Sequence, residues 1–214
     1  MDAKERIARR VALELQDGQL VNLGIGLPTL VANYLPEGVN VTLQSENGFV
    51  GLRGLGQDET PNPNITNAGG QPVGITNDGA FFDSSYSFAL IRGGHVDATV
   101  LGTLEVDQYG NIANYMIPGK MVPGMGGAMD LVTGANKVIV SMQHTSKGNI
   151  KILEQCTLPL TGKGVVDMIV TELAVFNVKD GYLELVEVAE ESSVEEVLEK
   201  TGAKVEVASD LKKF

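Results

Sequence analysis

The fold class of this chain is decided by residues 20–48, LVNLGIGLPTLVANYLPEGVNVTLQSENG. The apolar segment Leu20–Leu23 is typical of a short buried strand, and it runs into the glycine turn Gly24-Ile25-Gly26. We expect a helix over Thr29 to Leu35 and a second strand over Val39 to Gln44. A strand, a helix and a strand of these lengths predict a parallel βαβ unit.

The chain on either side of this unit continues the same alternation of strands and helices. Helices are predicted by apolar spacing and by N-cap residues; they cover Lys4–Gln16, Tyr86–Ile91 behind Asp83, Gly126–Val132, and Val194–Lys200 behind Ser192 or Ser193. Strands are expected at Ala98–Val106, Ile112–Ile117, Lys137–Met142, Val165–Thr171, Ala174–Val178 and Tyr182–Val188. The region from Gly51 to Gly79 is expected to be mostly loop or short irregular strands.

These elements predict one domain over residues 1–214. Its class is α/β, a mixed, largely parallel sheet flanked by helices. A chain of 214 residues is long enough to bury a core. We find no internal repeat and no linker that would divide the chain.

The composition and charge exclude several classes of function. The formal net charge is −11 and we see no cluster of Lys or Arg, so nucleic-acid binding is not expected. The apolar runs are too short to span a membrane, and the N-terminus has no signal-peptide core. We therefore expect a cytoplasmic protein without a membrane or nucleic-acid partner.

Glycine is the residue type with the most unusual frequency. The 26 glycines are about 12% of the chain, against a usual ~7%. They gather at Gly48–Gly56, Gly69–Gly70, Gly93–Gly94 and Gly119–Gly134, between well-patterned apolar segments. This distribution is typical of a rigid scaffold that presents several tight backbone loops.

Three of these loops have positions that suit chemistry. The turn Gly24-Ile25-Gly26 follows a strand, where anions often bind in α/β folds. Thr29 stands where a dinucleotide-binding motif needs its third glycine. A plain tight turn is therefore the simpler interpretation. Glu46 lies between small polar residues just past a strand. It is either a carboxylate that a substrate can reach or an ordinary solvated turn residue. The loop before Ala128 could offer N–H groups to an oxyanion or only permit close packing.

Other reactive residues point to no site. His95 and His144 lack the partners of a metal ligand, so we take both as structural and predict no metal. Cys156 lies in an apolar setting without a cationic neighbour, which favours a buried structural thiol. The chain has no Gly-x-Ser-x-Gly elbow and no Walker loop.

A series of motifs resembles the B module of the 3-oxoacid CoA-transferases, in order from about residue 5 to residue 200. The motifs are Asn22-Leu23-Gly24-Ile25-Gly26-Leu27-Pro28, Gln44-Ser45-Glu46-Asn47-Gly48, Asn67-Ala68-Gly69, Ile91-Arg92-Gly93-Gly94-His95-Val96-Asp97, Ile117-Pro118-Gly119-Lys120-Met121, Gly124-Met125-Gly126-Gly127-Ala128-Met129-Asp130 and Cys156-Thr157-Leu158-Pro159-Leu160-Thr161. The fold this resemblance implies is one that sugar-phosphate isomerases share.

The resemblance implies roles for individual residues. Glu46 matches the family's catalytic nucleophile, which carries CoA as a thioester. Asn22 matches an asparagine that lines the site, and Gly127 matches a glycine whose backbone N–H faces the thioester oxygen. Five further residues are expected to bind substrate with them: Gly24, Gly26, Asn47, Gly48 and Gly126.

The implied reaction is a ping-pong transfer of CoA between a short acyl-CoA or 3-oxoacyl-CoA and a free carboxylate. CoA esters are substrates, and no tightly bound cofactor is expected. The family builds its site from an A and a B module, so we expect an A subunit as partner, with two of each chain. Carboxylates attack thioesters without any proton transfer, which agrees with the lack of a suitable His.

Specificity is expected to resemble that of butyrate–acetoacetate or acetate CoA-transferases. Succinate- and 3-oxoadipate-using members usually have Lys where this chain has Gly70, and Phe81–Ser85 resembles the butyrate type. The segment Gly51–Gly56 departs from the family's usual run. A CoA-ester hydrolase, a sugar-phosphate isomerase and a non-catalytic ligand-sensing subunit remain as alternatives.

Overall fold

The computed structural model describes residues 1–120, 122 and 124–214. Within them, the largest sheet has ten strands. In spatial order these are β15 (Val205–Lys213), β14 (Tyr182–Val188), β13 (Ala174–Lys179), β12 (Met168–Val170), β8 (Val138–Ser141), β5 (Ala98–Leu101), β1 (Leu20–Leu23), β2 (Thr42–Ser45), β3 (Phe49–Arg53) and β4 (Gly74–Phe81).

The helices and the small sheets complete the described elements. The helices are α1 (Ala3–Ala12), the 3₁₀ helix η1 (Leu27–Tyr34), α2 (Ser84–Arg92), α3 (Ala128–Gly134) and α4 (Val194–Glu199). A three-stranded sheet contains β6 (Glu105–Asp107), β7 (Ile112–Ala113) and β11 (Ile152–Leu153), and a hairpin contains β9 (Thr145–Ser146) and β10 (Asn149–Ile150). None of the helices described is long and apolar enough to cross a membrane.

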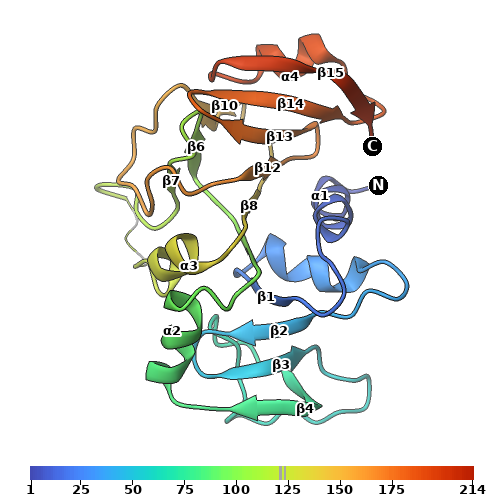
Figure 1. Cartoon of the computed structure of the whole chain (residues 1–214), viewed down its shortest axis with the longest axis vertical. Helices are drawn as coiled ribbons and strands as arrows, with labels where there is room; N and C mark the ends of the chain where they lie inside the picture. Colours follow the sequence, from blue (N-terminus) through green and yellow to red (C-terminus); the bar gives the residue numbers. More distant parts are fainter. Residues whose placement is uncertain (121, 123) are drawn as a thin grey trace.

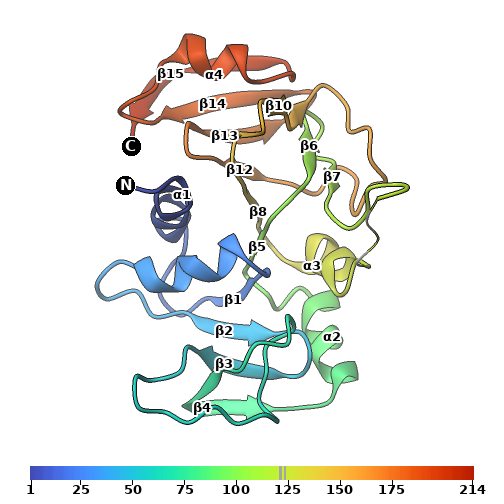
Figure 2. The same cartoon turned by 180° about the vertical axis from the view of Figure 1, so that it is seen from behind.

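The centre of the large sheet is parallel. Strands β2, β1, β5, β8 and β12 run in one direction, β3 and β13 flank them antiparallel, and β4 pairs antiparallel with β3. Helices α1 and η1 cover one face of this centre, and α2 and α3 cover the other (Figures 1 and 2). The prediction of an α/β fold with a mixed, largely parallel sheet flanked by helices is therefore confirmed.

Each face of the sheet has its own apolar core, because successive strand residues point to opposite faces. Val138 and Val140 of β8 pack with Ile91 of α2 and Leu131 of α3. Ile139, between those two valines, packs with α1 on the opposite face. The strict alternation makes the register of the central strands unambiguous.

The strand order also determines where a ligand can bind. The chain passes from β1 through η1 to β2 on one side, and it later returns to β5 on the other side of β1. Crossovers that leave neighbouring strands on opposite faces open a crevice beyond the strands' carboxyl ends. The segments that follow β1, β2 and β5 begin at Gly24, Glu46 and Gly102, so Glu46 lies at this crevice.

Several predicted boundaries are wrong. The first helix ends at Ala12 rather than Gln16, and η1 is a 3₁₀ helix that starts at Leu27. The strand predicted over Ala98–Val106 is two strands in different sheets, β5 and β6. The expected hairpin of β6 and β7 is present but short. No element was predicted for β15, a nine-residue edge strand.

The expectation of no basic cluster is also too strong. Arg6, Arg9 and Arg10 lie together on α1. Each forms an ion pair with a glutamate, and Arg10 binds both oxygens of Glu187 at 2.6 and 2.7 Å. The arginines therefore connect α1 to β14 and to its own first turn rather than forming a free basic surface.

Candidate active site

Glu46 lies directly after β2, in the tight turn that leads into the antiparallel strand β3. The Gly48 N–H closes this turn by donating to the Ser45 carbonyl at 3.0 Å. Gly48 has φ +132°, and a Cβ there would lie 2.4 Å from the Phe82 carbonyl oxygen. Only glycine fits at position 48. The tight turn can therefore form, and it places Glu46 at the end of β2.

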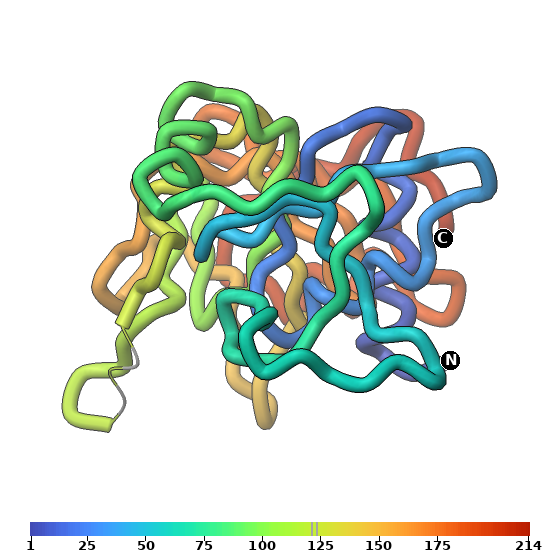
Figure 3. Tube along the Cα trace, turned by 90° about the horizontal axis from the view of Figure 1, so that it is seen from below, coloured from blue at the N-terminus to red at the C-terminus, as the bar shows by residue number. Residues whose placement is uncertain are grey.

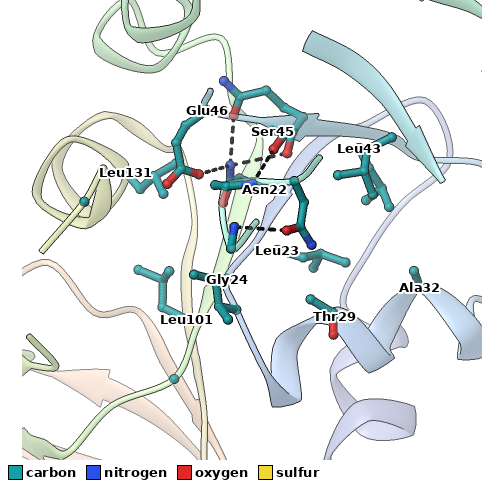
Figure 4. A pocket seen from close by; sticks show the side chains of 18 of the residues that line it. Asn22, Leu23, Gly24, Thr29, Ala32, Leu43, Ser45, Glu46, Leu101 and Leu131 are labelled. Carbon is teal, nitrogen blue, oxygen red and sulfur yellow. Dashed lines mark hydrogen bonds between the residues drawn. The ribbon is translucent and has the colours of Figure 1, made fainter. Parts of the chain in front are cut away.

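Two groups from distant parts of the chain contact the Glu46 carboxylate, and Figure 4 shows one of them, Asn22. The Asn22 Nδ2 group, at the end of β1, donates to Glu46 Oε2 over 3.4 Å. On the other side the backbone of Gly127, just before α3, lies so close that a Cβ there would be 3.1 Å from Glu46 Cγ. The half-buried carboxylate is thus held between an amide and a glycine backbone.

A cavity of about 960 Å³ opens beside the carboxylate. Its lining comes from the ends of β1, β2 and β5, from η1, from the loop between β3 and β4, and from the segment before α3. Figure 4 shows Glu46 and Leu131 at one end of this view and Leu43, Thr29 and Ala32 at the other. The space exceeds what an acetyl or butyryl group needs, so it can accept a larger thioester.

The described lining contains little charge. Its charged residues are Glu46 and Arg53. Arg53 Nη1 and Nη2 donate to the two carboxylate oxygens of Glu59 at 2.7 and 3.1 Å. The hydrogen bond from Arg53, followed by that from the Gly56 N–H, lowers the pKa of Glu59 to about 2. The cation is therefore engaged by its own loop rather than free for a ligand.

One wall of the cavity is the loop of residues 66–71, which is tied to β2 and to the Glu46 turn. The Ala68 N–H donates to Ser45 Oγ at 3.1 Å, and Asn47 Nδ2 donates to the Thr66 carbonyl at 2.8 Å. Within the loop, Asn67 Oδ1 accepts from the N–H groups of Gly69 and Gln71, both at 3.0 Å. Strand β2 therefore positions both Glu46 and the wall that faces it.

The structure brings together most of the residues expected at the site. Asn22, Gly24, Glu46 and Gly126 line the cavity, and Gly127 contacts Glu46 itself. Three others do not belong to the described lining. Gly26 has φ +86° and is the N-cap residue before η1, Asn47 binds the 66–71 loop, and Gly48 shapes the turn.

The histidines and the cysteine lie away from the cavity lining. His144 is fully buried, with Nδ1 2.9 Å from Thr171 Oγ1 and Nε2 3.0 Å from Thr201 Oγ1. Cys156 is half-buried, and burial together with Asp107 raises the pKa of its thiol far above the ordinary value. The thiol stays protonated and is no nucleophile. Met121, the last residue of one quoted motif, lies outside the described residues.

Two residues near the site were not singled out from the sequence. Gln44 is buried and binds Asn22, and Arg53 lines the cavity. Nothing local distinguishes Gln44 in the sequence, because Thr42 and Ser45 of the same strand are polar as well. Nothing local distinguishes Arg53, because its place in the lining depends on how β3 and β4 pair.

The Glu46 carboxylate lies beside glycine loops, in a cavity at the switch point of a parallel sheet. This arrangement is typical of α/β proteins in which a carboxylate reacts with a bound small molecule. The family model described as Coenzyme A transferase matches residues 4–200, and the chain belongs to that family. The resemblance found in the motifs is thereby confirmed.

Relatives and solved structures agree with this assignment. The chain is 62% identical to an Escherichia coli K12 protein named as the beta subunit of acetate CoA-transferase, covering 99% of this chain and 97% of that one. It is 47% identical to a Bacillus subtilis protein named as the B subunit of a probable succinyl-CoA:3-ketoacid coenzyme A transferase, covering 98% of both chains. The crystal structure of an acyl-CoA transferase from E. coli O157:H7 matches with a TM-score of 0.79 at 26% identity, covering all of this chain and 43% of that one.

Proposed function

We propose that this chain is the catalytic B chain of a CoA-transferase that carries CoA on Glu46 between two short carboxylic acids. The observation that supports this most directly is the contact set of Glu46, with Asn22 Nδ2 at 3.4 Å on one side and Gly127 on the other. A carboxylate held by an amide and a backbone glycine is nucleophilic, and the oxyanions formed from it have donors nearby.

The reaction begins when a Glu46 oxygen attacks the thioester carbonyl of the acyl-CoA. The C–S bond breaks, leaving a mixed acyl-glutamyl anhydride and CoA thiolate. The thiolate then attacks the glutamyl carbonyl, which forms the Glu46–CoA thioester and releases the first acid. The second acid reverses both steps. No proton is transferred at any of these steps, so the site does not need a general base.

We assign oxyanion stabilisation to Asn22 and to the backbone N–H of Gly127. Each tetrahedral intermediate places a negative oxygen on the former carboxyl or thioester carbon, and removal of one such donor costs ~10²–10³ in rate. Gly24 and Gly126, which line the cavity, allow the substrate to approach the backbone closely. Asn47 and Gly48 contribute by holding the loop and the turn.

We further propose an A subunit that completes the cavity, in an assembly with two of each chain. The relatives named above as subunits support the existence of a partner. The net charge of −11 and the paired state of Arg53 support a partner that supplies cations for the CoA phosphates. The stoichiometry, the cytoplasmic location and the absence of a tightly bound cofactor remain predictions.

For substrates we propose acetate, acetoacetate and butyrate rather than succinate. Gly70 is exposed with open space around it and offers no cation to a second carboxylate. Competing acceptors should therefore give a kcat/KM for acetate or butyrate above that for succinate. A succinate value tenfold higher than both would show that the partner or another residue provides the charge.

The decisive experiment is to trap CoA on Glu46. The complete enzyme, incubated with acetoacetyl-CoA and no acceptor, should yield a peptide carrying CoA at Glu46. Glu46→Gln should yield none and lose turnover, while Glu37→Gln, at an exposed turn residue, should behave as wild type. Full turnover in Glu46→Gln would contradict the mechanism. Acyl-CoA consumption that is independent of any acceptor would indicate a hydrolase instead.

A further inference from the structure

A row of buried polar side chains lies beneath Glu46, on the face of the sheet that α2 covers. Asn22 of β1 is 1% exposed, Gln44 of β2 is 3% exposed and Ser87 of α2 is fully buried. Asn22 Nδ2 donates to Gln44 Oε1 at 3.0 Å, and Gln44 Nε2 donates to Ser87 Oγ at 3.1 Å. The three side chains form one chain of hydrogen bonds that ends at Glu46.

This chain of bonds determines which end of the Asn22 amide faces Glu46. Gln44 Oε1 points to Asn22 and Gln44 Nε2 points to Ser87 Oγ, an orientation that the Ser87 hydroxyl supports by accepting from the amide. Two carbonyl oxygens cannot share a hydrogen bond, so Asn22 must turn its own NH₂ toward Gln44 and Glu46. The Asn22 contact to the Gln44 backbone carbonyl favours the same orientation, but at 3.4 Å it is weaker.

The orientation has a cost that the structure shows directly. Asn22 Oδ1 is buried and has no hydrogen-bond partner among the described residues. An unpaired buried acceptor is unfavourable, so Asn22 would not keep this orientation without the acceptors on its other side. A flipped amide would bring Oδ1 against Glu46 Oε2 and Gln44 Oε1, where acceptor would face acceptor.

We propose that Gln44, held by Ser87, is a positioning residue that keeps the Asn22 N–H donor directed at Glu46. This inference rests on the proposed function. In the ground state the Asn22 contact to Glu46 is long, at 3.4 Å. It becomes important when negative charge develops on that oxygen during formation and breakdown of the thioester. Gln44 acts through Asn22, so its contribution belongs to the rate of the chemical steps.

The test measures how fast the complete enzyme attaches CoA to Glu46 in a single turnover with acetoacetyl-CoA. Gln44→Met keeps the side-chain volume and removes both polar ends. We expect its rate to fall by about 10- to 100-fold, at most the loss caused by deleting an oxyanion donor. The KM for acetoacetyl-CoA should stay within about twofold, because the ground-state contact is weak.

A double-mutant cycle separates positioning from a general structural effect. In an Asn22→Ala background, Gln44→Met should lower the rate of CoA attachment by less than about twofold, because the donor that Gln44 orients is absent. Ser87→Ala should slow wild type and have no further effect in Gln44→Met. Thr99→Val is the matched control: Thr99 is buried beside Asn22 in the sheet, its hydroxyl has no described partner, and the change should leave the rate unaltered.

Three outcomes would overturn the inference. One is a wild-type rate in both Gln44→Met and Ser87→Ala. Another is a rate loss from Gln44→Met that is as large in the Asn22→Ala background as in wild type. The third is an equal loss in Thr99→Val. If Gln44→Met does not fold, Ser87→Ala and its cycle with Asn22→Ala decide alone. A wild-type enzyme that forms no CoA adduct would instead refute the proposed function.

Discussion

Gly127 lies so close to Glu46 that a side chain at this position would push the carboxylate aside. A Cβ there would be 3.1 Å from Glu46 Cγ and 3.2 Å from Oε1. Gly127→Ala should therefore displace the carboxylate by a few tenths of an ångström and reduce the rate of CoA attachment by about tenfold, since the reaction is sensitive to misplacement of the reacting atoms. Single-turnover labelling of the complete enzyme measures this rate directly.

The matched control is Gly56→Ala. Gly56 lies outside the described cavity lining, and a Cβ there would make an ordinary contact of 3.6 Å with Glu59. That variant should attach CoA at the wild-type rate. Wild-type labelling in Gly127→Ala would mean that the segment before α3 lies farther from Glu46 in the working enzyme.

His144 should make the stability of the chain depend on pH. Burial, followed by the charge of Lys200, lowers the pKa of His144 to about 4. The unfolded chain, with an ordinary His pKa of about 6.5, binds the proton more readily, so stability is complete above that pH and is lost as the pH falls toward 4. Between pH 7.5 and pH 5 the free energy of unfolding should decrease by about 2 kcal/mol from this residue.

Urea unfolding at the two pH values, compared with His144→Gln, isolates that contribution. The variant cannot titrate, so its decrease between pH 7.5 and pH 5 should be smaller than that of wild type by about 2 kcal/mol. This holds even if the variant is less stable at both pH values. Equal decreases in the two proteins would show that His144 does not titrate in this range.

Among the elements, β2 positions two parts of the site: Glu46, which follows the strand, and the loop of residues 66–71. Removing both tethers, in Ser45→Ala/Asn47→Ala, should release the loop while leaving Glu46 on its strand. We expect faster hydrogen exchange over residues 66–71 and a KM for acyl-CoA raised by about tenfold, since each bond contributes about 1 kcal/mol.

Asn64→Ala is the control for this loop. Asn64 is exposed in the same segment, and its described hydrogen bond is made by its backbone N–H. It should leave the KM and the exchange of residues 66–71 unchanged. A double variant with an unaltered KM would mean that the loop does not contact the substrate.

Local pattern predicts some elements of this chain and misses others. The Asp83 cap of α2 and the Ser193 cap of α4 were predictable, and both side chains accept the expected N–H. The division of Ala98–Val106 was not. Its apolar pattern is continuous, but Thr103 Oγ1 binds the Ala113 carbonyl and the chain leaves the large sheet to pair with β7 and β11. That division depends on partners distant in sequence.

For the whole molecule we predict that this chain is inactive without its partner. Two apolar side chains that line the cavity are exposed: Ile25 by 66% and Met125 by 37%. The yellow-green segment that leads to residue 120 projects from the body of the molecule (Figure 3). Apolar groups around an open cavity are typical of a surface that another chain covers. Transferase activity of the purified chain should be absent and should appear when the A subunit is added.

The variant pair Ile25→Asp and Leu13→Asp tests whether this surface is the contact. The two aliphatic side chains are about equally exposed, at 66% and 64%, but Leu13 follows α1 away from the cavity. Ile25→Asp should weaken assembly with the A subunit by more than about tenfold, and Leu13→Asp should not. Self-association of the chain alone would not decide the matter. Full turnover by a preparation free of any A subunit would end this prediction.

The βαβ start, the α/β class, the helix caps and the family follow from short stretches of sequence. They depend on apolar period, on N-cap residues and on motifs, which act over a few neighbouring positions. The contacts of Glu46 do not. Asn22, Glu46 and Gly127 meet because the crossovers of β1 and β5 leave opposite faces of the sheet, and the amide orientation of Asn22 depends on Gln44. Strand register and long-range packing bring these residues together, and neither is encoded in any single segment.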